Sequence, residues 1–121
     1  MSMFGGFYDK CSDAFGEKFG GECELINDSL LYGLIVAAGL YVENNPYGKR
    51  IKECGEEARG IWSDYANDFS CLPNTGIWGK VAKSEQYDKL DKVENLEQMY
   101  DVLFEFFIAH IELFDDRVTF E

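Results

Sequence analysis

The chain has 121 residues, 46% of them hydrophobic and 16% aromatic, which is enough for one packed domain and argues against disorder. Asp and Glu number 23 against 11 Lys and Arg, which gives a formal net charge of -12. This excess of acid argues against direct binding to nucleic acid or to an anionic membrane surface, because Lys and Arg make those contacts. The longest apolar run, from Leu30 to Val42, is shorter than the roughly 20 residues of a spanning helix, so no membrane span is expected.

The N-terminal residues show no basic segment leading into an apolar one, so we expect no secretory signal and a cytoplasmic location. Four cysteines, Cys11, Cys23, Cys54 and Cys71, form no CxxC or Cys/His pair, so no zinc site and no cofactor is expected. Cytoplasmic thiols stay reduced. Cys11 and Cys54 fall on apolar helix faces, where a cysteine is usually a small buried hydrophobe.

The first half of the chain predicts two helices. Ser2 to Phe19 carries apolar residues at spacings of three and four, and the following pair of glycines is typical of a helix end. A run of good N-cap residues from Asn27 to Ser29 opens the second helix, which continues to Val42. Because this helix is apolar all round, we expect it to be the central element. A buried parallel strand is the alternative, but the length and the Ala and Gly content favour a helix.

The third predicted helix runs from Pro46 to Phe69, with proline in its first turn. Its core stripe includes Tyr47, Cys54 and Trp62, and Lys49 with Glu53 forms an i, i+4 pair on its outer face. A loop follows, then a short helix at about Ile77 to Lys83 and another helix start at Ser84-Glu85-Gln86.

The last long helix is predicted from Asn95 to Asp116, with Asn95 and Gln98 as a cap and its third-position partner. One apolar face carries Leu96, Met99, Tyr100, Leu103, Phe106, Phe107, His110 and Phe114. The sequence therefore predicts an all-α fold: a compact bundle of four main helices plus one or two short helices, in a single domain over residues 1–121.

The negative charge is concentrated near the end of the chain, where residues 85–121 hold 11 acids and 3 bases. On the last helix, six carboxylates fall within about 100° of arc, with Ile108 among them and Phe104 and Ile111 at its flank. An apolar residue among carboxylates is a plausible interface anchor, and a merely solvated helix face is the alternative. The candidate partner-binding residues are Glu94, Glu97, Asp101, Glu105, Ile108, Glu112 and Trp78.

No arrangement of residues predicts catalysis or a metal site. His110 is the only histidine, it falls on the apolar face, and one imidazole does not make a catalytic site. No phosphate-binding glycine loop, serine-nucleophile motif or calcium loop is present. We therefore expect no enzyme activity. Trp78, in a loop flanked by glycines, either caps the core or is an exposed anchor.

In size, charge and lack of recognisable catalytic groups, the chain resembles small acidic bacterial or phage inhibitors. These include immunity proteins that neutralise nuclease toxins and proteins that mimic nucleic acid. The resemblance covers no aligned stretch, so no functional residue is carried over. It implies a non-catalytic inhibitor, an immunity or antitoxin-like protein, whose partner is a basic toxin nuclease or nucleic-acid-binding protein. The alternative is an acidic chaperone or self-assembling interaction protein that uses an apolar surface, and the chain is expected to be a monomer or a homodimer.

Overall fold

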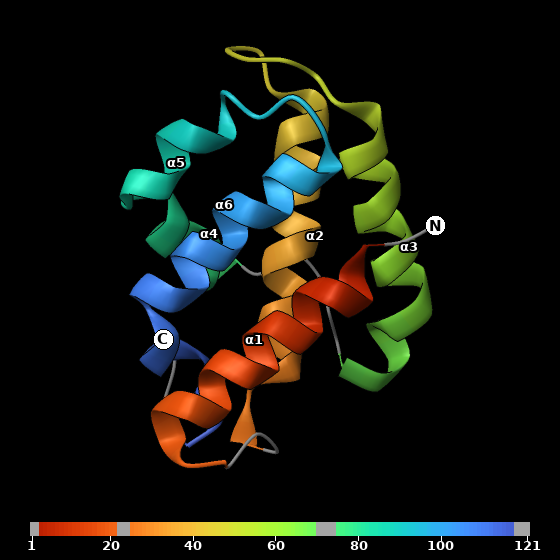
Figure 1. Cartoon of the computed structure of the whole chain (residues 1–121). Coiled ribbons are helices and arrows are strands. Elements are labelled where there is room, and N and C mark those ends of the chain that lie inside the picture. Colours follow the sequence, from red (N-terminus) through yellow and green to blue (C-terminus); the bar gives the residue numbers. More distant parts are fainter. Residues whose placement is uncertain (1–2, 22–24, 70–74, 118–121) are drawn as a thin grey trace.

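The computed structural model describes residues 3–21, 25–69 and 75–117. Its helices are α1 (Phe4–Phe19), α2 (Asp28–Asn44), α3 (Lys52–Phe69), α4 (Thr75–Ala82), α5 (Glu85–Leu90), α6 (Leu96–Ala109) and the 3-10 helix η2 (Ile111–Phe114) (Figure 1). Within the described residues, the only β-type pairing is an isolated antiparallel bridge between Ile26 and Asp115. The prediction of an all-α fold, with four long helices and two short ones, is confirmed.

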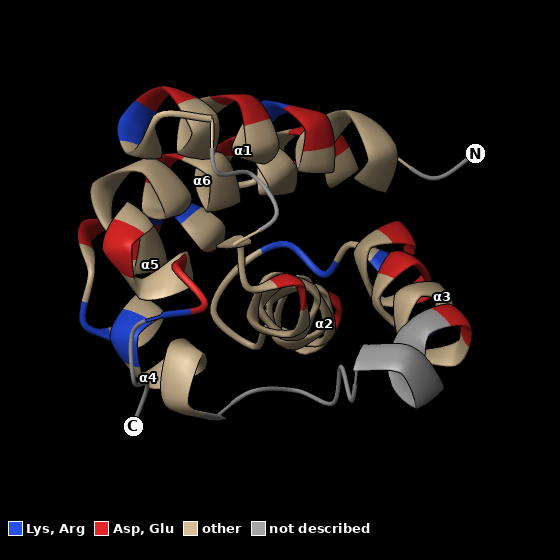
Figure 2. Ribbon diagram, turned by 90° about the horizontal axis from the view of Figure 1, so that it is seen from below, with Lys and Arg blue, Asp and Glu red and all other residues tan. Residues whose placement is uncertain are grey.

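Helix α2 is the central element of the fold. Figure 2 shows it end-on, with α1 and α6 on one side, α3 on another and α4 on a third. Its side chains are buried around most of its circumference, and Leu31, Leu34 and Ile35 are fully enclosed. Asn27 begins the helix by accepting a hydrogen bond from the Leu30 N–H at 2.9 Å. The predicted cap and central position are confirmed, and the alternative of a buried strand is wrong.

Helix α3 approaches α2 closely because small residues face each other across the contact. A Cβ atom added to Gly39 would lie 2.5 Å from the carbonyl oxygen of Cys54 and 2.8 Å from the Cβ of Ala58. Atoms do not pack at such distances, so this point of α2 requires glycine. The close approach buries Cys54 and Ala58 completely.

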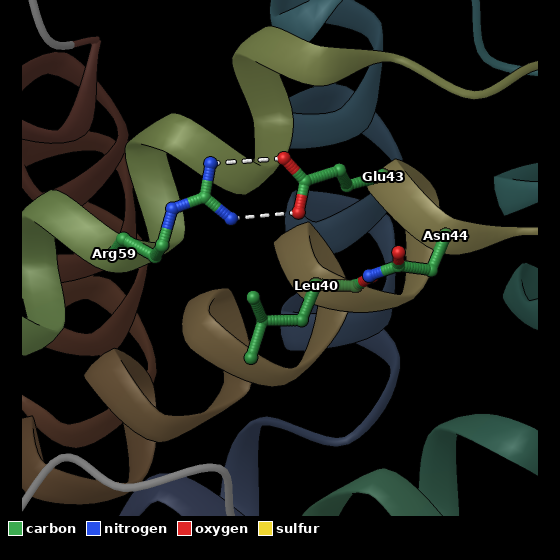
Figure 3. A network of polar contacts seen from close by, with 4 residues as sticks. All are labelled: Leu40, Glu43, Asn44 and Arg59. Carbon is green, nitrogen blue, oxygen red and sulfur yellow. Dashed lines mark hydrogen bonds and ion pairs between the residues drawn. The ribbon is translucent and has the colours of Figure 1, made fainter.

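An ion pair joins the C-terminal end of α2 to α3. Arg59 donates two hydrogen bonds to the Glu43 carboxylate, at 2.7 and 2.9 Å, while Asn44 turns back to donate to the Leu40 carbonyl oxygen (Figure 3). The carboxylate of Glu43 lies against Gly55, where an added Cβ would come within 2.1 Å of it. The hydrogen-bonded guanidinium lowers the pKa of Glu43.

We expect Glu43→Gln to lower the free energy of unfolding at neutral pH and to have no such effect in acid. The pKa of Glu43 is lower in the folded than in the unfolded chain. The ion pair therefore stabilises the fold above the unfolded-state pKa, and this contribution is lost as pH falls through the folded-state pKa. Urea unfolding of both proteins over a series of pH values measures the difference, with exposed Glu17→Gln as control. An equal loss at every pH would contradict the expectation.

The third helix begins at Lys52, and the prediction that it begins near Pro46 is wrong. Asn45 is 1% exposed, and its Nδ2 donates to the Asp91 carboxylate at 2.5 Å while its Oδ1 accepts from the Tyr47 N–H at 2.8 Å. These hydrogen bonds hold the segment before α3 as a loop against the connection between α5 and α6. Tyr47 is consequently 85% exposed instead of lying on the core stripe.

The last long helix ends at Ala109, so its predicted extension to Asp116 is also wrong. Beyond Ala109, the Phe114 carbonyl oxygen accepts from the Asn27 N–H at 2.7 Å, and the Asp116 N–H donates to the Leu25 carbonyl oxygen at 2.7 Å. These bonds tie the end of the described chain to the start of α2. The backbone leaves the α-helical path to reach them and forms η2 instead.

Helices α1 and α6 lie side by side and run in the same direction (Figures 1 and 2). The Phe7 and Tyr100 ring centroids are 4.9 Å apart, and further along the two helices Lys10 Nζ lies 4.5 Å from the centroid of the Phe104 ring. Helix α1 ends at Gly20, whose φ of 74° is left-handed, as the glycine pair predicted. We call the line of contact between α1 and α6 the α1–α6 seam.

Candidate protein-binding surface

The carboxylates predicted to bind a partner lie on the exposed side of α6 and at its two ends. Glu97, Asp101 and Glu105 are on the helix, Glu94 precedes it, and Glu112 is in η2; all five are exposed. Because α6 ends at Ala109, the row of carboxylates along the helix is shorter than predicted. Glu112 lies in η2 and does not belong to that row.

Three side chains fix the start of α6. Asn95 Oδ1 accepts from the Gln98 N–H at 2.8 Å, and Gln98 Oε1 accepts from the Glu94 N–H at 2.7 Å. The Glu53 carboxylate of α3 accepts from the Leu96 N–H at 2.9 Å. The predicted Asn95 cap is confirmed. No local pattern predicts the role of Glu53, because it reaches α6 from a distant part of the chain.

Lysines from other elements partly neutralise the acidic residues. Lys49 Nζ lies 3.7 Å from Glu94, Lys89 Nζ lies 2.6 Å from Glu105, and Lys18 Nζ lies 3.7 Å from Glu112. The Lys49–Glu53 pair predicted from helical spacing is wrong, because Lys49 precedes α3. The hydrogen bond to Glu105 raises the pKa of Lys89. These ion pairs are about half exposed, so each contributes little to stability.

Glu97 and Asp101 differ from the other three carboxylates. They lie one helical turn apart, and neither has a salt-bridge partner among the described residues. Both line a hollow of about 220 Å³ on the α1–α6 seam, which we call the first hollow. Its other lining residues are Met3, Gly6, Phe7, Lys10 and Tyr100. This part of the surface combines two unpaired carboxylates with an apolar floor.

Ile108 is 45% exposed, and it is one of three large hydrophobic residues exposed in the described part of the chain. It lines a second hollow of about 530 Å³ further along the seam. The other lining residues of this second hollow are Ala14, Glu17, Lys18, Phe104 and Ile111. Ile108 is therefore flanked by Phe104 and Ile111, as expected, but its surroundings include Lys18 as well as carboxylates.

Trp78 lies in α4, which agrees with the short helix expected at about Ile77 to Lys83 and not with the glycine-flanked loop. Its ring packs between Tyr41 and Tyr87, with centroid distances of 5.1 and 6.0 Å, and the residue is half-buried. The Tyr41 hydroxyl donates to Asp91 at 2.7 Å. Figure 2 shows α4 at the lower left of the molecule, away from α1 at the top. Trp78 is therefore remote from the α1–α6 seam, and of the two interpretations its contacts fit packing against the core.

Three buried groups, Tyr100, Cys54 and Cys11, are held in their neutral forms. Burial and a hydrogen bond to Glu57 raise the pKa of the Tyr100 hydroxyl. Burial also raises the pKa of the Cys54 thiol to about 12 and that of Cys11 further. Protonated thiols are poor nucleophiles, which agrees with their predicted role as small buried hydrophobes. Cys23 and Cys71 lie outside the described residues.

His110 follows the last residue of α6 and does not extend its apolar face. It is half-buried, with its ring centroid 4.7 Å from that of Phe106. Across the described residues, no group of three or more His, Cys, Asp or Glu side chains is arranged to hold a metal ion. What this surface offers chemically is attraction for cations at Glu97 and Asp101 beside an apolar contact at Ile108.

The chain matches no protein-family model, no curated protein and no solved structure. Among the described helices, none combines the length and the apolar character that crossing a bilayer requires.

Proposed function

We propose that this chain is a non-catalytic binding protein that inhibits a basic partner, a toxin nuclease or another nucleic-acid-binding protein. Carboxylates of the chain would occupy the cationic cleft in which the partner holds nucleic acid. The observation that carries the proposal is the pair Glu97 and Asp101, which is exposed and lies on the same ridge of α6 as Ile108. Among the described residues neither carboxylate forms a salt bridge, although Lys10 lines the same hollow.

Charge and apolar contact have separate tasks in this proposal. The net charge of -12 attracts a cationic partner over a distance and speeds association, up to about 10⁸–10⁹ M⁻¹s⁻¹ at low salt. Glu94, Glu105 and Glu112 contribute less to the contact, because their own lysines must first be displaced. Ile108 supplies an apolar contact, and such buried anchors slow dissociation.

One observation favours a second candidate function, that of an acidic chaperone or self-assembling protein. The second hollow is larger than the first, and Ile108, Phe104 and Ile111 make its lining substantially apolar. A protein of that kind would bind through the apolar surface, and salt would have little effect on the binding.

Affinity capture from the native host at two salt concentrations tests the proposal. Raising salt from about 50 to about 500 mM shortens the Debye length from about 14 to about 4 Å, which weakens contacts led by charge. We expect a basic nucleic-acid-binding protein to be captured at low salt and largely lost at high salt. With the purified partner, Glu97→Gln/Asp101→Asn should reduce the association rate constant about tenfold at low salt.

The matched control for this variant is Glu56→Gln/Asp64→Asn, which removes the same charge from exposed positions of α3. The control should leave association within about twofold of wild type, because Glu56 and Asp64 line neither hollow. If both double variants slowed association equally, overall charge and not this site would be responsible. A partner that stays bound equally well at both salt concentrations would favour the chaperone-like function.

A further inference from the structure

The two hollows follow each other along the same seam, and each is lined by both α1 and α6. The contact of Lys10 with the Phe104 ring lies between them. Asp101 borders the first hollow and Ile108 the second, and these residues are seven positions apart on one helix. At 1.5 Å per residue, that separation is about 10 Å along the helix axis.

The two hollows suit different side chains. At about 220 Å³ the first is smaller than the roughly 300–1,000 Å³ of small-molecule sites, so a single long side chain fills it. The apolar floor of Phe7 and Tyr100 suits an aliphatic stem, and the carboxylates of Glu97 and Asp101 suit a cationic head. Arginine meets both conditions, because its planar guanidinium binds carboxylates through paired hydrogen bonds.

At about 530 Å³ the second hollow has room for more than one side chain, and its Phe104 and Ile108 lining suits a bulky apolar residue, such as leucine or phenylalanine, with its neighbours. Phe104 is half-buried and Ile108 is 45% exposed, so a partner residue here would remove apolar surface from water. Glu17 and Lys18 of α1 line the same hollow and supply polar groups at its edge.

The charge of the seam selects the occupant. Four carboxylates, those of Glu17, Glu97, Asp101 and Glu112, lie along it or at its edges, against two lysines, Lys10 and Lys18. A second copy of this chain, itself at net -12, would bring acid against acid. Strand addition is unsupported, because the described residues offer no sheet edge, whereas a groove between two helices accommodates a third helix.

We infer that the α1–α6 seam binds an amphipathic helix of the basic partner, with an arginine in the first hollow and a bulky apolar residue in the second. Residues at i and i+7 of an α-helix lie on one face about 10 Å apart, which equals the axial separation of Asp101 and Ile108. The inference rests on the proposed function. It adds that α1 forms part of the binding surface and that the segment of the partner bound there is helical.

A selection from a displayed library of peptides tests this inference. The library would present Ala-rich helical peptides with several randomised surface positions to the folded full-length chain. We expect the enriched peptides to carry a basic residue and a bulky apolar residue at i and i+7, or i and i+8, in either order. Their affinity, measured by fluorescence anisotropy, should fall about tenfold or more with Glu97→Gln/Asp101→Asn and also with Ile108→Ser.

Two control variants accompany these measurements. Tyr47→Ser removes a large exposed side chain that, unlike Ile108, lies outside the seam. Glu56→Gln/Asp64→Asn removes two exposed carboxylates of α3. Both should change the affinity of the peptides by less than about twofold. All these positions are exposed, so circular dichroism should show the fold unchanged in every variant.

Each contrary result overturns a different statement. Peptides that respond to Glu97→Gln/Asp101→Asn but not to Ile108→Ser would overturn the two-hollow inference and leave the proposed function standing. Peptides that keep their affinity when a central residue is replaced by proline would show that the occupant is not helical. Peptides that respond to neither variant would overturn both proposals. A chain that sediments as a dimer, and as a monomer after Ile108→Ser, would show that a second copy occupies the seam.

Discussion

Gly39→Ala is expected to destabilise the chain by about 2 kcal/mol, although alanine favours helix over glycine. The added methyl carbon would lie 2.5 Å from a carbonyl oxygen of the α3 backbone at Cys54 and 2.8 Å from the Ala58 side chain. Neither atom is at the far end of a flexible side chain that could move aside, so the two helices must separate. Overpacking of this kind costs about 1–3 kcal/mol, here at the upper end, and helix propensity offsets about 1 kcal/mol.

Gly60→Ala is the matched control, because Gly60 lies in α3 with no atom within 4 Å of an added Cβ. This substitution should stabilise the chain by about 0.5–1 kcal/mol through helix propensity alone. Urea unfolding followed by circular dichroism measures both free energies. Stabilisation by both substitutions would show that α2 and α3 are not in close contact at Gly39.

Phe114→Ala is expected to lower the free energy of unfolding by about 3–5 kcal/mol, as is usual when a buried phenylalanine is truncated. The Phe114 ring is fully buried, with centroids 4.8 Å from that of Phe107 and 6.3 Å from that of Phe106. The backbone hydrogen bond from Asn27 is retained in the variant, so the loss measures the ring. Leu113→Ala, at a half-buried neighbouring position, should cost much less.

The measurement is again urea unfolding, compared at one pH and temperature. A loss for Phe114→Ala no larger than that for Leu113→Ala would contradict the place of η2 in the core. The expected difference would show that the segment after α6 stabilises the bundle.

Much of the fold could be predicted because its signals are local in the sequence. The all-apolar run after Asn27 requires a surrounded helix, and Asn27 and Asn95 cap the helices that they were expected to cap. Gly20 ends α1 in the left-handed conformation that glycine adopts easily. In each case a few neighbouring residues contain the whole physical reason.

The errors arise where distant residues decide the local structure. Nothing near Ala109 ends a helix; the chain turns there because residues 114–116 bond to residues 25–27. The segment after Pro46 has helical spacing, but a hydrogen bond from Asn45 to Asp91 holds it as a loop.

The same reason limits prediction of the candidate site. Periodicity predicted the exposed carboxylates of α6. It did not predict which of them form salt bridges with lysines and which do not. That difference depends on Lys18, Lys49 and Lys89, which come from three other parts of the chain. The contribution of α1 to the surface also has no signal in the sequence, because it follows from the parallel packing of α1 against α6.

That packing joins two helices, α1 and α6, that are far apart in the sequence. On the ribosome, α1 emerges with Phe7 and its other core residues uncovered, and α6 is made only after all the residues between Phe19 and Leu96. At about 5–20 residues per second, this interval lasts on the order of 4–15 s. During it the core residues of α1 lack α6 as a packing partner, so the α1–α6 seam forms only once translation has passed α6.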